Sequence, residues 1–248
     1  MPETKYILIL ANSVRSQKHC VAGKVATPQA DGNYDIGMEW IRLTDPRVPD
    51  GAVPYANTIC PGKGSVRPLQ LIKVELQDSC NDANHPEDWN FEPTLQWTWE
   101  SSTTFASLPI VADNPPKIWH DGSASNSVLA GYVPKMPAPA ATLYLIKAPD
   151  GWSFTFWKEW NSFENRNDVK RKLTFSYAGE YHEFSVTDKA FTSRHNIYNR
   201  ATETRQTLTV PDPNNVYFCL SLTRLTPPDV NLRFSLHHYK ICATIFEP

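Results

Sequence analysis

Short stretches of alternating or continuous apolar residues recur along this chain, and both patterns predict β-strands. Residues 6–10 form a continuous apolar run, as expected of a strand that is covered on both faces. Residues 173–177 and 182–186 each alternate between apolar and polar positions, and a short turn lies between them. These two segments predict a β-hairpin, and residues 216–222 and 239–246 predict two later strands.

Two further predicted strands carry features of interest. Residues 39–43 alternate and place Trp40 and Arg42 on one face of the strand. The alternation predicts that this Trp and Arg pair is exposed. Residues 69–76 predict a strand whose apolar positions change phase at residues 71–72, as a β-bulge would require.

Proline-rich and polar segments divide the chain. Residues 77–116 mix Asn, Asp, Pro and Trp and predict a long irregular excursion, with a short helix near residues 101–108. Three prolines within residues 134–141 favour an extended linker, so the predicted domains are residues 1–135 and 142–248. The 21 prolines and the 12% aromatic content disfavour long helices, and the chain is predicted to be mainly β.

Composition excludes several classes of protein. A hydrophobic content of 41% with 20% charged residues is far from the disordered range. The apolar run near the N-terminus is too short for a membrane span or a signal-peptide core, so we expect a cytoplasmic protein with no membrane partner. Five cysteines without CxxC spacing argue against a disulfide framework or a zinc ribbon.

The charges are unevenly distributed although the formal net charge is only −2. Residues 75–121 hold nine acidic residues and one basic residue, whereas residues 166–205 hold eight basic and five acidic residues. We therefore expect a polyanion to approach the second of these stretches.

An ordered set of short motifs resembles the bacterial dual OB-containing domain family. These motifs are Leu10-Ala11-Asn12-Ser13, Cys20-Val21-Ala22-Gly23, Trp40-Ile41-Arg42, Leu143-Tyr144-Leu145-Ile146, Val186-Thr187-Asp188, Leu220-Ser221-Leu222 and Tyr239-Lys240-Ile241-Cys242-Ala243. The resemblance implies two OB-like β-barrels in an accessory protein of prokaryotic conflict or anti-phage defence systems, with nucleic acid or a nucleotide as the ligand. It leaves open whether the barrels share strands.

The first group of candidate binding residues lies between residues 12 and 24. Asn12, Ser13, Arg15 and His19 offer amide, hydroxyl and cationic donors that could bind phosphate oxygens, together with Lys18 and Lys24. The alternative is a solvated turn in which Asn12 and Ser13 bond to local backbone.

Two candidate stacking positions pair a tryptophan with a cation. Trp40 and Arg42 could stack on a base, unless Trp40 caps the core and Arg42 pairs with Asp45. Trp157 beside Lys158, with Trp160 nearby, is the second such position, although most tryptophans of small barrels belong to the core.

The basic stretch supplies the last group of candidates. Cations interleave there with aromatic Tyr198, as in proteins that bind single strands. The candidate residues are Lys170, Arg171, Arg194, His195 and Arg200. A solvated charged face is the alternative.

Enzymatic motifs are weak. Asp150, followed later by Asp168 and Lys170, matches the residue pattern of the PD-(D/E)xK nuclease motif. However, residues 165–170 predict a polar turn and not the strand that this motif requires. We therefore predict a non-catalytic binding protein with no cofactor, no metal and no catalytic residue. The alternative is an adaptor that docks an effector helicase or nuclease through the acidic stretch, and a metal-dependent nuclease is a distant third.

Overall fold

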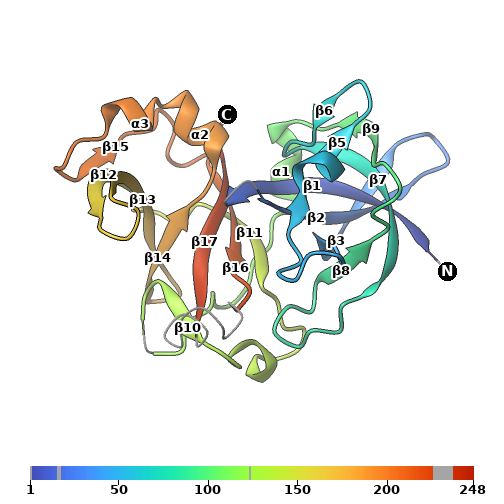
Figure 1. The fold of residues 1–248 in the computed structure, drawn as a ribbon, viewed down its shortest axis with the longest axis horizontal. Helices are drawn as coiled ribbons and strands as arrows, with labels where there is room; N and C mark the ends of the chain where they lie inside the picture. Colours follow the sequence, from blue (N-terminus) through green and yellow to red (C-terminus); the bar gives the residue numbers. More distant parts are fainter. Residues whose placement is uncertain (1, 16–17, 123, 226–236) are drawn as a thin grey trace.

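Three long antiparallel strands begin the fold: β1 (Glu3–Arg15), β2 (Lys18–Pro28) and β3 (Tyr34–Thr44). The computed structural model describes residues 2–15, 18–122, 124–225 and 237–248. In it, β8 (Asp88–Phe91) runs parallel to β3, and β7 (Gln70–Ser79) pairs antiparallel with both β8 and β1. The order β1-β2-β3-β8-β7 thus closes a five-stranded barrel, at the right of Figure 1.

Several short strands and helices lie beside this first barrel. They are β4 (Val53–Pro54), which pairs with β2, η1 (Tyr55–Thr58), the short hairpin of β5 (Ile59–Cys60) and β6 (Gly64–Ser65), β9 (Thr98–Ser102), η2 (Phe105–Ser107) and α1 (Leu108–Val111). The predicted excursion therefore contains two strands, β8 and β9, and its helical part begins at Phe105 and not near residue 101. The bulge predicted at Leu71 and Ile72 is confirmed by a register shift in the pairing of β7 with β9.

The second barrel repeats the strand order of the first. Its strands are β11 (Leu143–Lys147), β12 (Ser153–Asn161), β13 (Arg166–Tyr177), β14 (Glu180–Val186), β16 (Tyr217–Leu222) and β17 (His237–Phe246). β12, β13 and β14 form an antiparallel meander, β17 runs parallel to β14, and β16 pairs antiparallel with β17 and β11. The order of the sheet is thus β11-β16-β17-β14-β13-β12, with β11 directly before β12 in the chain.

Helices cover one end of the second barrel. α2 (Lys189–Arg194) and α3 (Ile197–Arg200) follow β14, and β15 (Gln206–Leu208) adds to β12, as Figure 1 shows at the left. The predicted hairpin is confirmed as β13 and β14, with Ala178 and Gly179 at positive φ in its turn. The predicted polar turn at residues 165–170 is wrong, because β13 begins at Arg166. The mainly β fold with two OB-like barrels is confirmed.

Three apolar cores hold the molecule together. One fills the first barrel and includes Ile7 and Ile9, another fills the second, and the third lies between them and includes Leu8, Leu145 and Phe246. Both faces of β1 are thus covered, as its continuous apolar run predicts. No described strand belongs to both of the large sheets, but the two barrels share this third core.

The segment before the predicted linker belongs with the second barrel. β10 (Ser127–Leu129) pairs with β17, η3 (Val133–Lys135) follows it, and Trp119 and Val128 pack in the second core. The domain limits at residues 135 and 142 remain a prediction, and these contacts favour a boundary nearer residue 116. No helix among the described residues has the length and apolar character needed to cross a membrane.

Candidate nucleic-acid interface

The predicted loop near the N-terminus is wrong, because most of its residues are paired in strands, while phosphate binding by this segment stays a prediction. Asn12 lies opposite Val21 in the ladder of β1 and β2, and Ser13 lies opposite Cys20. The amide of Asn12 donates to the carbonyl of Val66 at 2.7 Å, and its oxygen lies 2.6 Å from Nδ1 of His19. Asn12 and His19 therefore fix the barrel wall.

The other candidates of this segment have different surroundings. Arg15 ends β1, and its side chain lies outside the described residues. His19 is buried, and burial, with the charge of Lys189, lowers the pKa of its imidazole. Lys24 is also buried and forms an ion pair with Asp113 at 2.6 Å, so it is not available to a ligand.

The predicted exposure of Trp40 and Arg42 is wrong. Their exposed fractions are 7% and 4%, because the second barrel covers this face of β3. Nε1 of Trp40 donates to Asp113 at 3.1 Å, and the Arg42 guanidinium donates to Asp88 at 3.2 Å and to Ser221. A base cannot stack on either side chain in this arrangement. The alternative pairing of Arg42 with Asp45 is also wrong, since Asp45 pairs with Arg47.

Part of the acidic stretch is turned inward at the same junction. Asp88 accepts hydrogen bonds from Arg42 and from Arg224, and Glu87 accepts from the hydroxyl of Thr142 at 2.9 Å. Burial raises the pKa of Glu87, although the charge of Arg42 opposes this shift. With Asp113, three of the nine acids in residues 75–121 hold the barrels together and do not face solvent as a docking surface.

A tryptophan and two cations meet on the outer face of the second barrel. Trp157 on β12 lies directly opposite Lys170 on β13. The guanidinium carbon of exposed Arg205 lies 4.1 Å from the centre of the Trp157 ring. The neighbouring residue Phe156 points to the other side and is fully buried. The structure thus combines three residues that are far apart in the sequence into an aromatic platform with cations beside it.

The remaining basic candidates form two other groups. On the opposite side of the sheet, Arg171 donates to the hydroxyl of Tyr198 at 2.7 Å, and the Arg200 guanidinium lies 5.5 Å from the ring centre of Phe156. On α2, Arg194 and His195 both bind the carboxylate of Glu247, at 2.6 and 2.8 Å. The basic stretch is therefore not one continuous surface, and Arg194 is partly neutralised.

Two exposed aromatic residues lie at the end of β12 and in the turn that follows it. Trp160 is 58% exposed and Phe163 is 99% exposed. The Asn161 side chain fixes this turn, because its oxygen accepts from the Phe163 amide at 3.1 Å and its nitrogen donates to Asp168 at 2.6 Å. Phe163 was not among the predicted candidates. An apolar ring within the polar run of residues 161–165 is the signal that identifies it.

The nuclease motif has no metal-binding geometry in the part of the chain that the structure describes. Asp168 lies on a strand, but its carboxylate binds Asn161 and Arg166. Hydrogen bonds from these two residues lower the pKa of Asp168. No group of three His, Cys, Asp or Glu residues that could hold a metal ion occurs among the described residues.

A family model and a solved structure are similar to this chain. Among curated proteins, none matches the chain. A solved structure described as a replication protein A heterotrimer bound to ssDNA is similar, with 10% identity and a TM-score of 0.35. The similarity covers 89% of this chain and 44% of that chain, so the chain spans less than half of its length. The dual OB-containing domain family matches residues 5–245, nearly the whole sequence. With two barrels of the same strand order, the chain belongs to the dual OB-containing domain family.

Proposed function

We propose that this protein binds nucleic acid through the outer face of its second barrel and carries out no reaction itself. The observation that carries the proposal is the cluster of Trp157, Lys170 and Arg205. A base can stack on the tryptophan or on the arginine guanidinium, while the cations contact the phosphates. This combination of base stacking and phosphate contacts is typical of proteins that bind single-stranded nucleic acid with little sequence preference.

The turn between β12 and β13 supports the same function. Its exposed ring, Phe163, extends the aromatic surface beyond the strands, whereas Trp160 lies on β12 and points to the opposite side of the sheet from Trp157. OB barrels bind oligonucleotides on a sheet face and with the loops beside it, and the first loop of the meander is one of them. Asn161 already fixes this turn. Ordering of the turn would therefore cost little entropy when a nucleic-acid strand stacks on Phe163.

The biological role follows from the family expectation. We propose that the protein is an accessory component of a prokaryotic defence system that recognises single-stranded nucleic acid in the cytoplasm. The alternative role is docking of an effector helicase or nuclease through the outward-facing acids of residues 75–121, such as Asp78. Failure of every polymer to bind, with capture of an effector encoded nearby, would favour this alternative.

Fluorescence anisotropy with labelled single-stranded DNA, duplex DNA and RNA at two salt concentrations tests the proposed surface. We expect Lys170→Glu to weaken single-strand binding by roughly tenfold or more and to reduce the salt dependence. We expect Trp157→Ala to weaken binding by about 1–3 kcal/mol through loss of stacking.

A matched variant separates this surface from general charge effects. Arg67→Glu changes the charge by the same amount at an exposed position of the first barrel. It should leave the affinity within about twofold of the wild type, apart from a small uniform electrostatic effect. Equal losses for Lys170→Glu and Arg67→Glu would show that the outer face of the second barrel is not the binding surface.

A further inference from the structure

A second site lies between the two barrels, away from the outer face described above. It is a cavity of about 400 Å³, lined by strands of both halves of the chain. Lys18, His19 and Arg224 supply cationic or hydrogen-bonding groups, and Leu225 and Ile241 supply aliphatic surface. A cavity with one polar corner and one apolar wall is typical of a small-molecule site.

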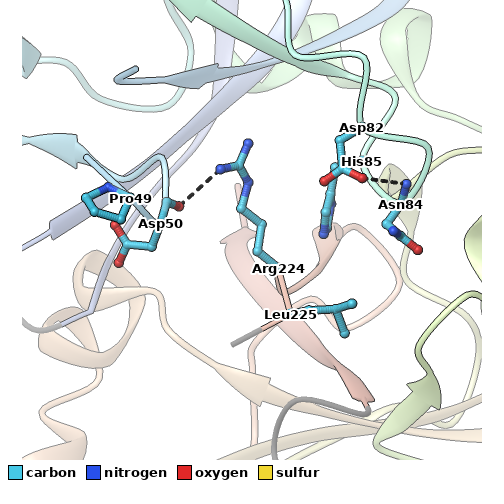
Figure 2. Close-up of a pocket in the computed structure, with 7 residues that line it drawn as sticks. All are labelled: Pro49, Asp50, Asp82, Asn84, His85, Arg224 and Leu225. Atoms are coloured by element: carbon cyan, nitrogen blue, oxygen red, sulfur yellow. Dashed lines mark hydrogen bonds between the residues drawn. The ribbon is translucent and has the colours of Figure 1, made fainter. Parts of the chain in front are cut away.

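The polar corner is built around Asp50. Nζ of Lys18 lies 3.0 Å from the Asp50 carboxylate, and the Arg224 guanidinium donates to the Asp50 carbonyl at 3.2 Å. Figure 2 draws a neighbouring pocket that shares Asp50, Arg224 and Leu225 with this cavity, and it shows the Arg224 guanidinium between Asp50 and His85. Two residues from different barrels are thus held at one point, close enough to contact the same anionic group.

Arg224 retains hydrogen-bonding capacity at this corner. A guanidinium has five N–H donors. Among the described residues, Asp88 takes two of them and the Asp50 carbonyl takes a third. The other two donors make no hydrogen bond within the described ranges, and Arg224 lines the cavity.

Arg42 adds a second unusual donor. It is 4% exposed, lines the same cavity, and its Nε makes no hydrogen bond within the described part of the chain. A buried donor without a partner is costly, and such donors mark sites that an oxygen atom can complete. The lining of the cavity contains three cations, Lys18, Arg42 and Arg224, and one carboxylate, Asp50, so the lining favours an anion. Asp88 and Glu87 also interact with Arg42, but they do not line the cavity.

We propose that this cavity binds a nucleoside monophosphate, with the phosphate at Lys18 and Arg224 and the base against Leu225 and Ile241. The inference rests on the proposed function for the choice of a nucleotide, but it concerns a different site and a free ligand. The volume is sufficient, since small-molecule pockets begin at about 300 Å³. Cys20 and Ser13 also line the cavity.

Calorimetric titration of the full chain with AMP, adenosine and inorganic phosphate tests this proposal. We expect AMP to bind with a Kd on the order of 10–100 μM, as is usual for a ligand of this size. Adenosine and phosphate should each bind at least about tenfold more weakly, because each makes only part of the contacts. No heat of binding with millimolar AMP, or phosphate binding as tightly as AMP, would overturn the proposal.

Two leucine substitutions locate the site. Ala52→Leu fills part of the cavity and should weaken AMP binding by roughly tenfold or more, whereas Ala56→Leu places the same side chain on an exposed position nearby. Equal AMP affinity for the two variants would overturn the assignment. Anisotropy with single-stranded DNA distinguishes the two sites: Ala52→Leu should leave oligonucleotide binding intact, and Lys170→Glu should leave AMP binding intact. If the wild type binds oligonucleotide but not AMP, only the proposal for the cavity has failed. If the wild type binds AMP but not oligonucleotide, only the proposed function of the outer face has failed.

Discussion

The carboxylate of Asp88 shows how single residues join the two barrels. It is fully buried and accepts hydrogen bonds from Arg42 on β3 and from Arg224 just after β16. A buried charge is tolerated when it is paired and hydrogen-bonded, and its partners are fixed in place in return. The position of Arg224 in the cavity therefore depends on Asp88.

Gly51 allows Arg224 to take this position. Its φ is +65°, and a Cβ atom at Gly51 would lie 2.0 Å from a guanidinium nitrogen of Arg224. We expect Gly51→Ala to lower the free energy of unfolding by about 2–3 kcal/mol, from backbone strain and from displacement of Arg224. Urea unfolding of the purified variant measures this loss.

Gly62→Ala is the control for the backbone contribution. Gly62 has a similar φ of +72°, but no atom lies within 4 Å of the position a Cβ would take. Its loss should be only about 1 kcal/mol. If both variants lose the same stability, then contact with Arg224 contributes nothing at Gly51.

Residue exposure was the least predictable property. Alternation in β3 correctly separates Trp40 and Arg42 from Ile41 and Leu43, but the sequence does not say what covers each face. The covering residues, Thr142 and Ser221, lie about 100 and 180 positions away. Pattern analysis detects periodicity within a segment and has no access to such distant partners.

At the scale of elements, β14 and β17 bring two titratable groups together. Nζ of Lys240 lies 3.1 Å from Nδ1 of His182, and it also donates to the Ser125 carbonyl at 2.8 Å. Burial, with the charges of Lys240 and His120, lowers the pKa of His182 to about 4. Burial lowers the pKa of Lys240 to about 8, although Asp121 and Glu180 oppose the shift.

Stability should therefore depend on pH in two windows. Below pH 6.5 the unfolded chain protonates His182 while the folded chain does not, so stability falls as the pH drops from 6.5 towards 4. Between pH 8 and 10.5 the unfolded chain retains the Lys240 proton that the folded chain has lost, so this residue's contribution to stability rises with pH. Thermal unfolding across these ranges measures both slopes.

His182→Gln identifies the source of the acid slope. When the pH drops from 7 to 5, we expect the free energy of unfolding of this variant to fall by roughly 1–2 kcal/mol less than that of the wild type. Part of the slope remains, because burial also lowers the pKa values of His85 and His238. Substitution of the half-exposed His237 by Gln is the control and should leave the slope unchanged. An unchanged slope in His182→Gln would contradict the assignment.

Local elements were the most predictable feature of the fold. The hairpin of β13 and β14 follows from alternation on both sides of a two-residue turn, and all of that information lies within about fifteen residues. The platform at Trp157 was predicted only in pieces. Its members lie on β12, on β13 and just before β15, and only the pairing of these strands places them together.

At the scale of the whole molecule, the barrels depend on each other. The core between them includes Leu145, Cys219 and Phe246 of the second barrel, and the second core includes Trp119 from the segment before it. A fragment of residues 142–248 would expose the first group and lack the second. We expect it to show no cooperative urea transition, because too little apolar surface remains buried.

A longer fragment tests the contribution of the preceding segment. Residues 116–248 restore Trp119, Val128 and the pairing of β10 with β17. This fragment should unfold cooperatively, at a lower urea midpoint than the full chain. If residues 142–248 alone unfold at the midpoint of the full chain, the barrels are independent and the shared core contributes no stability.

The position of β17 also has a consequence for synthesis. β17 lies between β14 and β16 and pairs with both, yet it follows them in the chain. A ribosome therefore releases β14 and β16 as unpaired edges, and they stay open until the ten residues of β17 emerge. Such edges bind other strands readily, so we expect the nascent second barrel to be prone to wrong strand pairing until β17 is in place.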